Sequence, residues 1–508
     1  MPKELTRRNA LKLSGLALGG LTVGGIAKAR GQADDVCALS GTCYPNHIEK
    51  AKYSYFDDLD EFEPMLPWGT QNPLEKDEMR IMFVGSGIPP NLRRVQQMMS
   101  VFVEVGWDEQ KKRPLDSFVF DCGSGVCTNY NALGVSFGRM DKVFLAHLHG
   151  DHASDLSHIY CFGPSADRKT PLYVFGPGPS GVRNPSGRPR FYDDGTRAFC
   201  RNLRETWRWH TESFSFLPTG LEDPEIPSRW DWGLPCRPVP VGDDPSSDGY
   251  ALIPIELNWR RVGGVAYHNR TSGVKITHFP VVHCRQGSIG YKLEWRKPGG
   301  GVLTMIFTSD TRPETVSIEH ARNRDHRGVP RGVDVLIHEM IVPPEIWAMK
   351  VLGLPEPLEP GKSEEFDNAV ATASRVQNSS HTPQGAFGYL LSQIDPRPRL
   401  TMATHFPVAD DTVDCALKSV RAHVPDVAWD KKYDPVHHNI AWARDLMVLR
   451  VFEHDILQRQ ARVSDFEYSA LPEATGPTAD PKYATETDQI DTRNVIPAGP
   501  GTYCDTGY

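Results

Sequence analysis

Short hydrophobic runs alternate with polar, glycine-rich segments from residue 79 to about residue 410. Most runs are rich in β-branched and aromatic residues and end at glycine or a polar residue, which is typical of buried β-strands. Residues 155–162 and 382–394 have a longer apolar period and indicate helices between the strands. The runs that we interpret as strands are "MRIMFVGSG", "SVFVEVG", "SFVFDCGSG", "KVFLAHLHG", "PLYVFGPG", "VKITHFPVVH", "IGYKLEW", "LTMIFTSD", "DVLIHEM" and "RLTMATHF".

The pattern weakens in three other parts of the chain. Residues 30–78 are polar and punctuated by proline, so we expect an N-terminal extension. Residues 177–272 are rich in Trp, Arg and Pro and have weak periodicity, which predicts an insertion within a domain spanning 79–450. Residues 451–508 turn polar and rich in Thr, Asp and Pro, which indicates a C-terminal tail.

The first 29 residues resemble a twin-arginine export signal. Arg7 and Arg8 precede a weakly apolar Gly/Ala/Leu stretch that ends at Ala27-Lys28-Ala29. A membrane anchor is the alternative, but the 15 residues from Leu13 to Ala27 are fewer than the ~20 that a spanning helix needs. We therefore predict cleavage after residue 29, export by the twin-arginine machinery to the periplasm or the medium, and no stable membrane insertion.

Charge and cysteine content narrow the classes of partner and site. The chain has a net charge of −8, and removal of residues 1–29, which carry +4, leaves −12. An acidic protein repels a phosphate backbone, so we expect no nucleic-acid partner. The ten cysteines include no CxxC pair, which excludes a zinc ribbon. After export, Cys37 could pair with Cys43 and Cys122 with Cys127, although free thiols are equally compatible with the sequence.

The segment "VFLAHLHGDH" gathers four ligand-grade side chains behind one hydrophobic run. Strand alternation would place His147 and His149 on the same side, and a sharp turn at Gly150 would let Asp151 and His152 face back toward them. Imidazole and carboxylate ligands without cysteine favour a zinc-type metal that keeps positions open for water and substrate. The spacing therefore predicts two adjacent half-sites for divalent metals.

The same motif is similar to the signature of the metallo-β-lactamase superfamily. The flanking motifs resemble its ribonuclease Z-like branch in their order along the chain, over residues 79 to 410 apart from the insertion. That branch includes tRNA 3′-processing nucleases and exported arylsulfatases. The resemblance implies an α/β fold, a four-layer αββα sandwich, here with the insertion and both terminal extensions. The matching motifs are "VGSGIPP", "VFDCGSG", "VFGPGPSG", "VVHCRQGSIGYKLEW", "FTSDT", "DVLIHEM", "SSHT" and "ATHF".

The resemblance also implies a ligand set for two divalent metal ions, expected to be Zn²⁺. One ion would be held by three histidines and the other by Asp151 with two histidines, while Asp310 would bridge both. The first set is His147, His149 and His283, and the second is Asp151, His152 and His405. The three later ligands each follow an apolar run, where ordinary polar strand caps also occur, and their order behind the first motif is what favours the metal site.

Four residues are candidates for catalysis. Asp151 is one of them as well as a ligand. His381 in "SSHTPQG" corresponds to a histidine that reaches the scissile group in this branch, so it is expected to donate a proton or stabilise an oxyanion. His338 and Glu339 in "LIHEM" match a motif that orients such a histidine, and structural support without direct chemistry is an equal alternative.

Two metals that share a carboxylate would lower the pKa of a bridging water toward neutrality and so supply a hydroxide nucleophile. In tRNA-processing members of the branch a long arm follows the strand matching "GYKLEW", whereas this chain has only a short Gly-rich turn there. We therefore predict an exported hydrolase of small-molecule esters, either sulfate (arylsulfatase-like) or phosphate esters. The alternatives are a ribonuclease Z-like tRNA 3′-processing phosphodiesterase and a catalytically silent metal-binding protein. The sequence is compatible with a homodimer.

Overall fold

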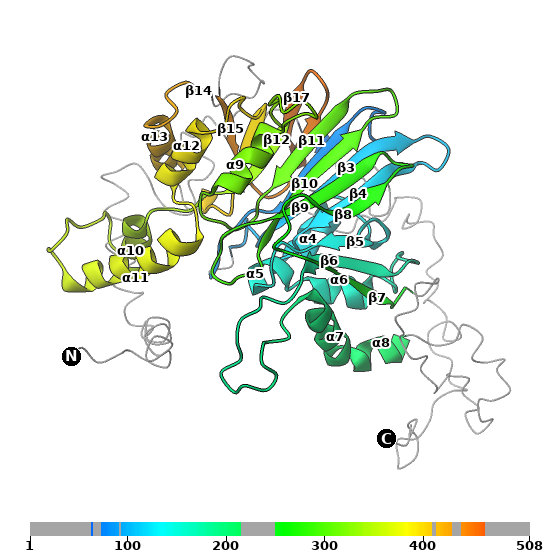
Figure 1. Cartoon of the computed structure of the whole chain (residues 1–508), viewed down its shortest axis with the longest axis horizontal. Coiled ribbons are helices and arrows are strands. Elements are labelled where there is room, and N and C mark those ends of the chain that lie inside the picture. The colour runs from blue at the N-terminus through cyan, green and yellow to red at the C-terminus, as the bar shows by residue number, and fades with distance from the viewer. Residues whose placement is uncertain are drawn as a thin grey trace, which may run out of the picture. The chain divides into compact units, whose positions relative to one another are not determined.

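Two β-sheets lie face to face and carry helices on their outer surfaces (Figure 1). The computed structural model describes residues 62–64, 73–90, 93–214, 249–408, 413–428 and 438–462, which belong to one compact unit that begins at Leu59. The expected export signal, residues 1–29, lies outside these ranges, as do Cys37 and Cys43. Within the described ranges, no helix is both long and apolar enough to cross a membrane.

The first sheet has the strand order β1-β17-β16-β2-β3-β4-β5-β6-β7. Strands β16, β2, β3 and β4 pair antiparallel, whereas β4, β5, β6 and β7 pair parallel. The hydrophobic runs form strands because both faces of this sheet are covered, and all seven residues of β2 are buried. The strands are β1 (Phe62–Pro64), β2 (Met79–Gly85), β3 (Ser100–Asp108), β4 (Arg113–Phe120), β5 (Lys142–Phe144), β6 (Leu172–Pro177), β7 (Leu252–Leu257), β16 (Met447–Val451) and β17 (Ile456–Arg462).

The second sheet has the order β14-β15-β13-β12-β11-β10-β9-β8. Strands β8 to β11 pair antiparallel, and β11, β12, β13 and β15 pair parallel. Its strands are β8 (Gly264–Asn269), β9 (Val274–Pro280), β10 (Ile289–Arg296), β11 (Val302–Phe307), β12 (Val335–Glu339), β13 (Leu400–Thr404), β14 (Val427–Ala428) and β15 (His438–Trp442).

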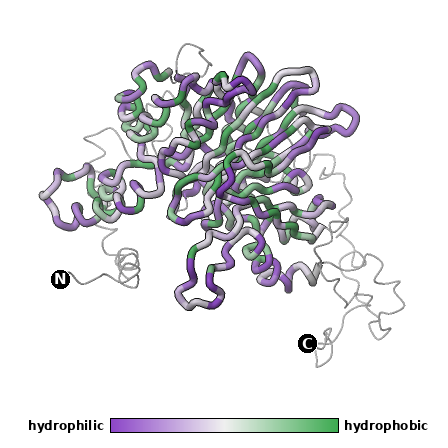
Figure 2. Tube along the Cα trace, viewed as in Figure 1, coloured by the Kyte–Doolittle hydropathy of each residue, from purple (hydrophilic) through white to green (hydrophobic). Residues whose placement is uncertain are grey.

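Aromatic side chains join the inner faces of the two sheets. The ring of Tyr291 on β10 lies 5.8 Å from that of Phe120 and 5.5 Å from that of Phe144, and its hydroxyl donates to Leu145 O at 2.8 Å. Burying each of these rings stabilises the fold by roughly 1.5–3 kcal/mol. Figure 2 shows hydrophobic residues concentrated along the strands of both sheets, where this core lies.

Helices cover both outer faces. On the first sheet, Val126 of α4, Ile159 of α6 and Cys200 of α7 share one buried cluster with strand residues. On the second sheet, α9 packs on β9, and α12 lies against β12. This arrangement confirms the α/β class and the predicted αββα layering. The helices are α4 (Val126–Ala132), the 3₁₀ helix η1 (Phe137–Arg139), α5 (Gly150–Ala153), α6 (Leu156–Phe162), α7 (Thr196–Thr206), α8 (Arg208–Phe214), α9 (Thr315–Arg322), α10 (Pro344–Leu352), α11 (Glu364–Ser380), α12 (Gln384–Ser392) and α13 (Val413–Arg421).

The structure differs from the sequence expectation at two boundaries. Residues 177–272 supply β7 and β8, which are edge strands of the first and second sheets, so this segment is partly integral to both sheets. Strand β8 is mostly exposed or half-buried, which explains its weak hydrophobic periodicity. The polar tail expected from residue 451 begins inside β16, and β17 continues the first sheet to Arg462.

Several strands of the two sheets deliver polar side chains to one region of the sandwich. Parallel neighbours end at the same edge of a sheet, and ligands commonly bind there. Asp121 follows β4, and the "HLHGDH" segment follows β5, its parallel partner. Asp310 follows β11, Glu339 ends β12 and His405 follows β13, which are consecutive parallel strands of the second sheet.

Candidate metal centre

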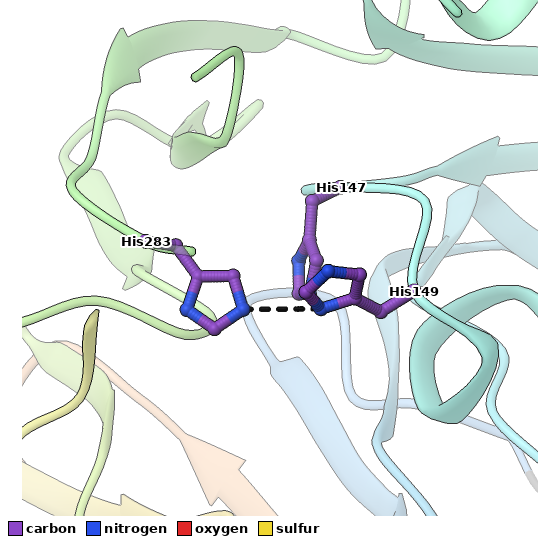
Figure 3. A group of neighbouring side chains, drawn as sticks. All are labelled: His147, His149 and His283. Carbon is purple, nitrogen blue, oxygen red and sulfur yellow. Dashed lines mark hydrogen bonds between the residues drawn. The ribbon is translucent and has the colours of Figure 1, made fainter. Parts of the chain in front are cut away.

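His147 and His149 lie in the segment that follows β5. The strand ends three residues before His147, so the strand alternation that we expected to align the two rings is absent. The segment is anchored instead by Ala146, whose N–H donates to Asp121 Oδ1 at 2.8 Å. Leu148 packs against the hydrophobic cluster, and the two flanking imidazoles both approach His283 (Figure 3).

His283, which follows β9, completes a set of three imidazoles. Its Nε2 lies 3.1 Å from His149 Nδ1, and its ring centroid lies 4.7 Å from that of His147. One nitrogen of each ring lies within 4.8 Å of the others. Burial lowers the pKa of His147 and His149, and the positive neighbours lower it further, so both rings favour the neutral form. Neutral imidazole is the form that binds a metal.

A short helix, α5, opens with the second half of the motif. Its residues Gly150 to Ala153 carry Asp151 and His152 into the same region, as expected. Gly150, however, does not have a positive φ, and a Cβ there would meet only Ser154 Oγ, at 3.5 Å. The close approach occurs at Gly123, where a Cβ would lie 2.0 Å from Asp151 O. Glycine is therefore required beside Asp151 and not at the turn itself.

Asp151, His152 and His405 form a second set. Asp151 Oδ2 lies 3.2 Å from His152 Nε2 and 3.3 Å from His405 Nε2. Burial alone would raise the pKa of Asp151, but the charge of His152 and the hydrogen bonds from both histidines hold it well below its usual range. The carboxylate is therefore ionised, as a metal ligand must be.

Asp310 lies between the two sets. Its Oδ1 is 3.4 Å from His152 Nε2, and its Oδ2 is 3.4 Å from His405 Nε2 and 3.8 Å from His283 Nε2. The side chain is buried, which by itself would raise its pKa, yet the charges of His405 and His152 hold the pKa well below its usual value. Asp310 thus touches both sets, which is the arrangement that a bridging carboxylate needs.

Asp121 supports His152 and was not assigned a role from the sequence. Its Oδ2 lies 2.7 Å from His152 Nδ1 and accepts from Ser309 Oγ at 2.9 Å. Fixing Nδ1 turns Nε2 toward Asp151 and Asp310, as carboxylates beside metal-binding histidines do. The available signal was an acidic residue directly after the hydrophobic run "SFVF", inside a motif already singled out.

Three non-glycine residues near the metal-ligand sets have a left-handed backbone conformation. They follow β4, β11 and β13 respectively, and their φ values are 55° at Asp121, 54° at Ser309 and 55° at His405. Each such conformation costs on the order of 1–3 kcal/mol and persists only where the surroundings hold it. The strain lies at the ends of the strands that build the site.

His381 and Glu339 join the site, whereas His338 does not. Glu339 Oε2 lies 2.8 Å from His381 Nδ1, and His381 Nδ1 lies 3.9 Å from Asp310 Oδ2. His338, one residue earlier on β12, projects to the opposite face and packs with its ring 5.8 Å from Phe387 of α12. The orienting role expected for the pair therefore falls to Glu339 alone in this geometry.

The buried donors and acceptors of the site fit a divalent cation. Both ring nitrogens of His147 lack a hydrogen-bond partner, as do His152 Nε2 and Asp310 Oδ1. Leaving buried polar atoms unpaired is costly, and it becomes reasonable where a ligand satisfies them. Histidine nitrogens and carboxylate oxygens are the donor types that zinc-like metals take. The residues present thus fit one metal ion at each set.

No thiol belongs to these two sets. Cys122 and Cys127 are free, so the local disulfide that the spacing allowed is not formed. Cys284 is free and exposed beside His283, and its Sγ donates to Ser380 Oγ at 3.3 Å.

Comparison with known proteins finds similarity over part of the chain. No family model matches. Ribonuclease BN of Enterobacter sp. (strain 638) is 33% identical over 109 residues, which are 21% of this chain and 32% of that protein. Ribonuclease Z of Treponema denticola is 35% identical over 66 residues, 13% of this chain and 21% of that protein. The matched segments thus span a third or less of these relatives.

Solved structures are similar at low sequence identity. The metallo-β-lactamase fold protein YhfI from Bacillus subtilis aligns with a TM-score of 0.41 and 12% identity, covering 74% of this chain and all of that one. A long-form RNase Z from yeast aligns with a TM-score of 0.40 and 13% identity, covering 75% and 42%. Zn²⁺-bound PqqB from Methylobacterium extorquens aligns with a TM-score of 0.37 and 11% identity, covering 73% and 100%. The chain is thus similar to ribonucleases BN and Z over a limited segment, and its own strand pairing establishes the two-sheet α/β fold.

Proposed function

We propose that the protein is a metal-dependent hydrolase that cleaves a sulfate or phosphate ester of a small molecule. The observation that carries the proposal is the convergence of seven histidine and aspartate side chains, in which both ring nitrogens of His147, His152 Nε2 and Asp310 Oδ1 have no hydrogen-bond partner. Two divalent ions, which we expect to be Zn²⁺, would activate water at neutral pH and stabilise negative charge on the substrate.

The chain's own residues would divide this work. His147, His149 and His283 would hold one ion, and Asp151, His152 and His405 the other. Asp310 touches both sets, and its negative charge would offset the repulsion between two cations. Asp121 would keep His152 in the orientation that presents Nε2 to the second set.

His381 would act on the substrate rather than on the metals. Burial alone would lower the pKa of His381, but in the metal-free protein the charge of Glu339 raises it to about 11, so the ring is protonated there at neutral pH. Glu339 holds Nδ1 of the ring at 2.8 Å, which leaves Nε2 to donate a hydrogen bond to a charged oxygen of the substrate. His381 would therefore stabilise the oxyanion that develops on the substrate.

A small substrate is favoured by the connection between β10 and β11. Residues 297–301 form a tight turn between the paired ends of these strands, so no arm extends from this point. Similarity to ribonucleases BN and Z favours a second candidate, hydrolysis of a phosphodiester in RNA. The two candidates share the metal centre and differ only in the substrate that is presented to it.

A substrate panel tests the proposal. The zinc-loaded protein is assayed with p-nitrophenyl sulfate, bis(p-nitrophenyl) phosphate and a precursor tRNA, beside His147→Ala as the control that removes a ligand. Turnover of a small ester that the variant loses supports the proposal. Cleavage confined to the tRNA supports the ribonuclease reading. Metal binding without turnover of any of the three substrates contradicts both candidate activities and indicates a catalytically silent metal-binding protein.

A further inference from the structure

A buried carboxylate outside the ligand sets holds the segment on which the second set rests. Asp445 lies in the connection from β15 of the second sheet to β16 of the first, and it is 9% exposed. Its Oδ1 accepts from Ser86 N and Oγ at 3.0 and 2.9 Å. Its Oδ2 accepts from Gln97 N at 2.6 Å and from Asn129 Nδ2 at 2.8 Å. Four donors thus converge on one side chain.

The first connection to the metal centre runs through Phe406. Phe406 N donates to Ser86 O at 3.2 Å, and Phe406 O accepts from Gln96 Nε2 at 2.6 Å. Gln96 Nε2 also lies 3.2 Å from Ser86 Oγ, which donates to Asp445. The backbone N–H and C=O of Phe406 are therefore bound by Ser86 and Gln96, and Asp445 holds Ser86 directly. The preceding residue, His405, is held in a left-handed backbone that needs such support.

The second connection runs through Met99. Met99 N donates to Asp151 O at 3.1 Å, and Met99 O accepts from Gly123 N at 2.9 Å. Met99 lies two residues after Gln97, whose backbone is fixed by Asp445. The segment from Gln96 to Met99 therefore binds the backbone of Asp151 and that of Phe406, the residue after His405.

We propose that Asp445 is a positioning residue for the second ligand set, Asp151, His152 and His405, and that it leaves the first set unaffected. The inference rests on the proposed function for the identity of the two sets. Among the described residues, Asp445 is linked to Asp151 and to the residue after His405 through residues 86 and 96–99. The segments that carry His147, His149 and His283 are held instead through Ala146 and Ser380. Loss of the Asp445 carboxylate should therefore weaken binding of the ion at the second set and leave binding at the first set unchanged.

Two variants and a matched control test this. Asp445→Asn turns an N–H₂ group toward donors, and Gln96→Leu removes the hydrogen bond to Phe406 O together with the contact to Ser86 Oγ. The control is Asp116→Asn on β4, because Asp116 is 7% exposed and also accepts four hydrogen bonds, from Ser117 N, Tyr267 Oη, Asn269 Nδ2 and Ser272 Oγ. Asp116 lies five residues before Asp121, roughly 16 Å along the strand.

The first readout is zinc content and affinity by titration with a chromophoric chelator. We expect the wild type and Asp116→Asn to bind two ions, and both test variants to keep one ion at wild-type affinity while the other binds at least tenfold more weakly. Equal weakening of both ions, or two ions at wild-type affinity in both test variants, overturns the inference.

The second readout is amide hydrogen exchange of the metal-free protein. We expect faster exchange at residues 404–408 in both test variants and at residues 150–153 in Asp445→Asn, with residues 143–148 and 281–283 unchanged in both. Uniform acceleration across all four segments would mean general destabilisation and overturns the inference. A wild type that binds no metal contradicts the proposed function, whereas this exchange pattern still decides whether Asp445 positions the two segments.

Discussion

Glu339 Oε2 lies 2.8 Å from His381 Nδ1, and the carboxylate also accepts a hydrogen bond from Thr311 N through Oε1. The backbone thus fixes the carboxylate, and the carboxylate fixes the imidazole at the C-terminal end of α11. Because Thr311 directly follows Asp310, the same carboxylate ties the orientation of His381 to the segment that carries the bridging aspartate.

Glu339→Gln should release the proton of His381. The charge of Glu339 raises the pKa of His381 to about 11, so in the metal-free wild type the ring stays protonated at pH 8. Without that charge the pKa falls and the ring titrates at lower pH. The ¹⁵N shifts of the imidazole report this directly. His320, whose pKa burial lowers to about 4, serves as an internal reference that stays neutral in both proteins. An unchanged titration of His381 contradicts the pairing.

Asp310→Ala should reduce metal content more than loss of any single histidine ligand. The carboxylate lies within 3.8 Å of nitrogens from both sets, and its removal leaves two cations without a shared negative charge. We expect both ions to be lost on dialysis, as measured by mass spectrometry of metals. His149→Ala is the comparison, for which the second set should keep its ion. Two ions still bound to Asp310→Ala would rule out the bridging role.

Asp121→Asn should weaken metal binding at the second set without removing a ligand. The amide keeps the shape of the carboxylate but loses the charge that orients His152 through Nδ1. Loss of such support typically costs about 10–100-fold in metal affinity. Competition with a chelator measures the change. Asp155→Asn, which alters the acceptor of the Cys127 N–H, is the control and should bind metal normally. Normal binding by Asp121→Asn would refute the supporting role.

Cys284 should be a reactive thiol in the metal-free protein. Hydrogen bonds with His283 and His381 lower its pKa to about 5, and the side chain is exposed. At pH 6 it is mostly thiolate, and after allowance for the lower nucleophilicity of an acidic thiol it should be alkylated roughly tenfold faster than an ordinary thiol. Peptide mapping after iodoacetamide treatment locates the label, with Cys284→Ser as the blank. A rate that keeps rising between pH 7 and pH 9 would contradict the lowered pKa.

Replacement of Arg7 and Arg8 by lysine should stop export. We propose that residues 1–29 direct the chain through the twin-arginine route, which requires the paired arginines. The variant should accumulate in the cytoplasm at wild-type amounts, as followed by cell fractionation. Lys12→Arg keeps the charge outside the pair and should be exported. Undiminished export of the double-lysine variant rejects the proposal.

The sequence by itself was sufficient for the central strands and the ligand types. Runs such as "MRIMFVG" and "LTMIF" become β2 and β11 because both faces of each sheet are covered, and continuous hydrophobic runs express that burial directly. The spacing in "HLHGDH" places four ligand-grade groups within six residues, which local chain geometry alone brings near each other. The edge strands β7 and β8, and the strand β17, were not anticipated, since half-exposed strands have little hydrophobic signal.

Only the tertiary structure decided which residues support the site and which do not. Nothing in "LIHEM" tells that Glu339 faces His381 while His338 faces Phe387, because neighbouring residues on a strand point to opposite faces and the sequence does not say which face is the site. The role of Asp445 depends on contacts with residues more than 300 positions away, such as Ser86 and Asn129. Pairings of that kind form when the two sheets pack together, and they cannot be predicted from the residues near Asp445 in the sequence.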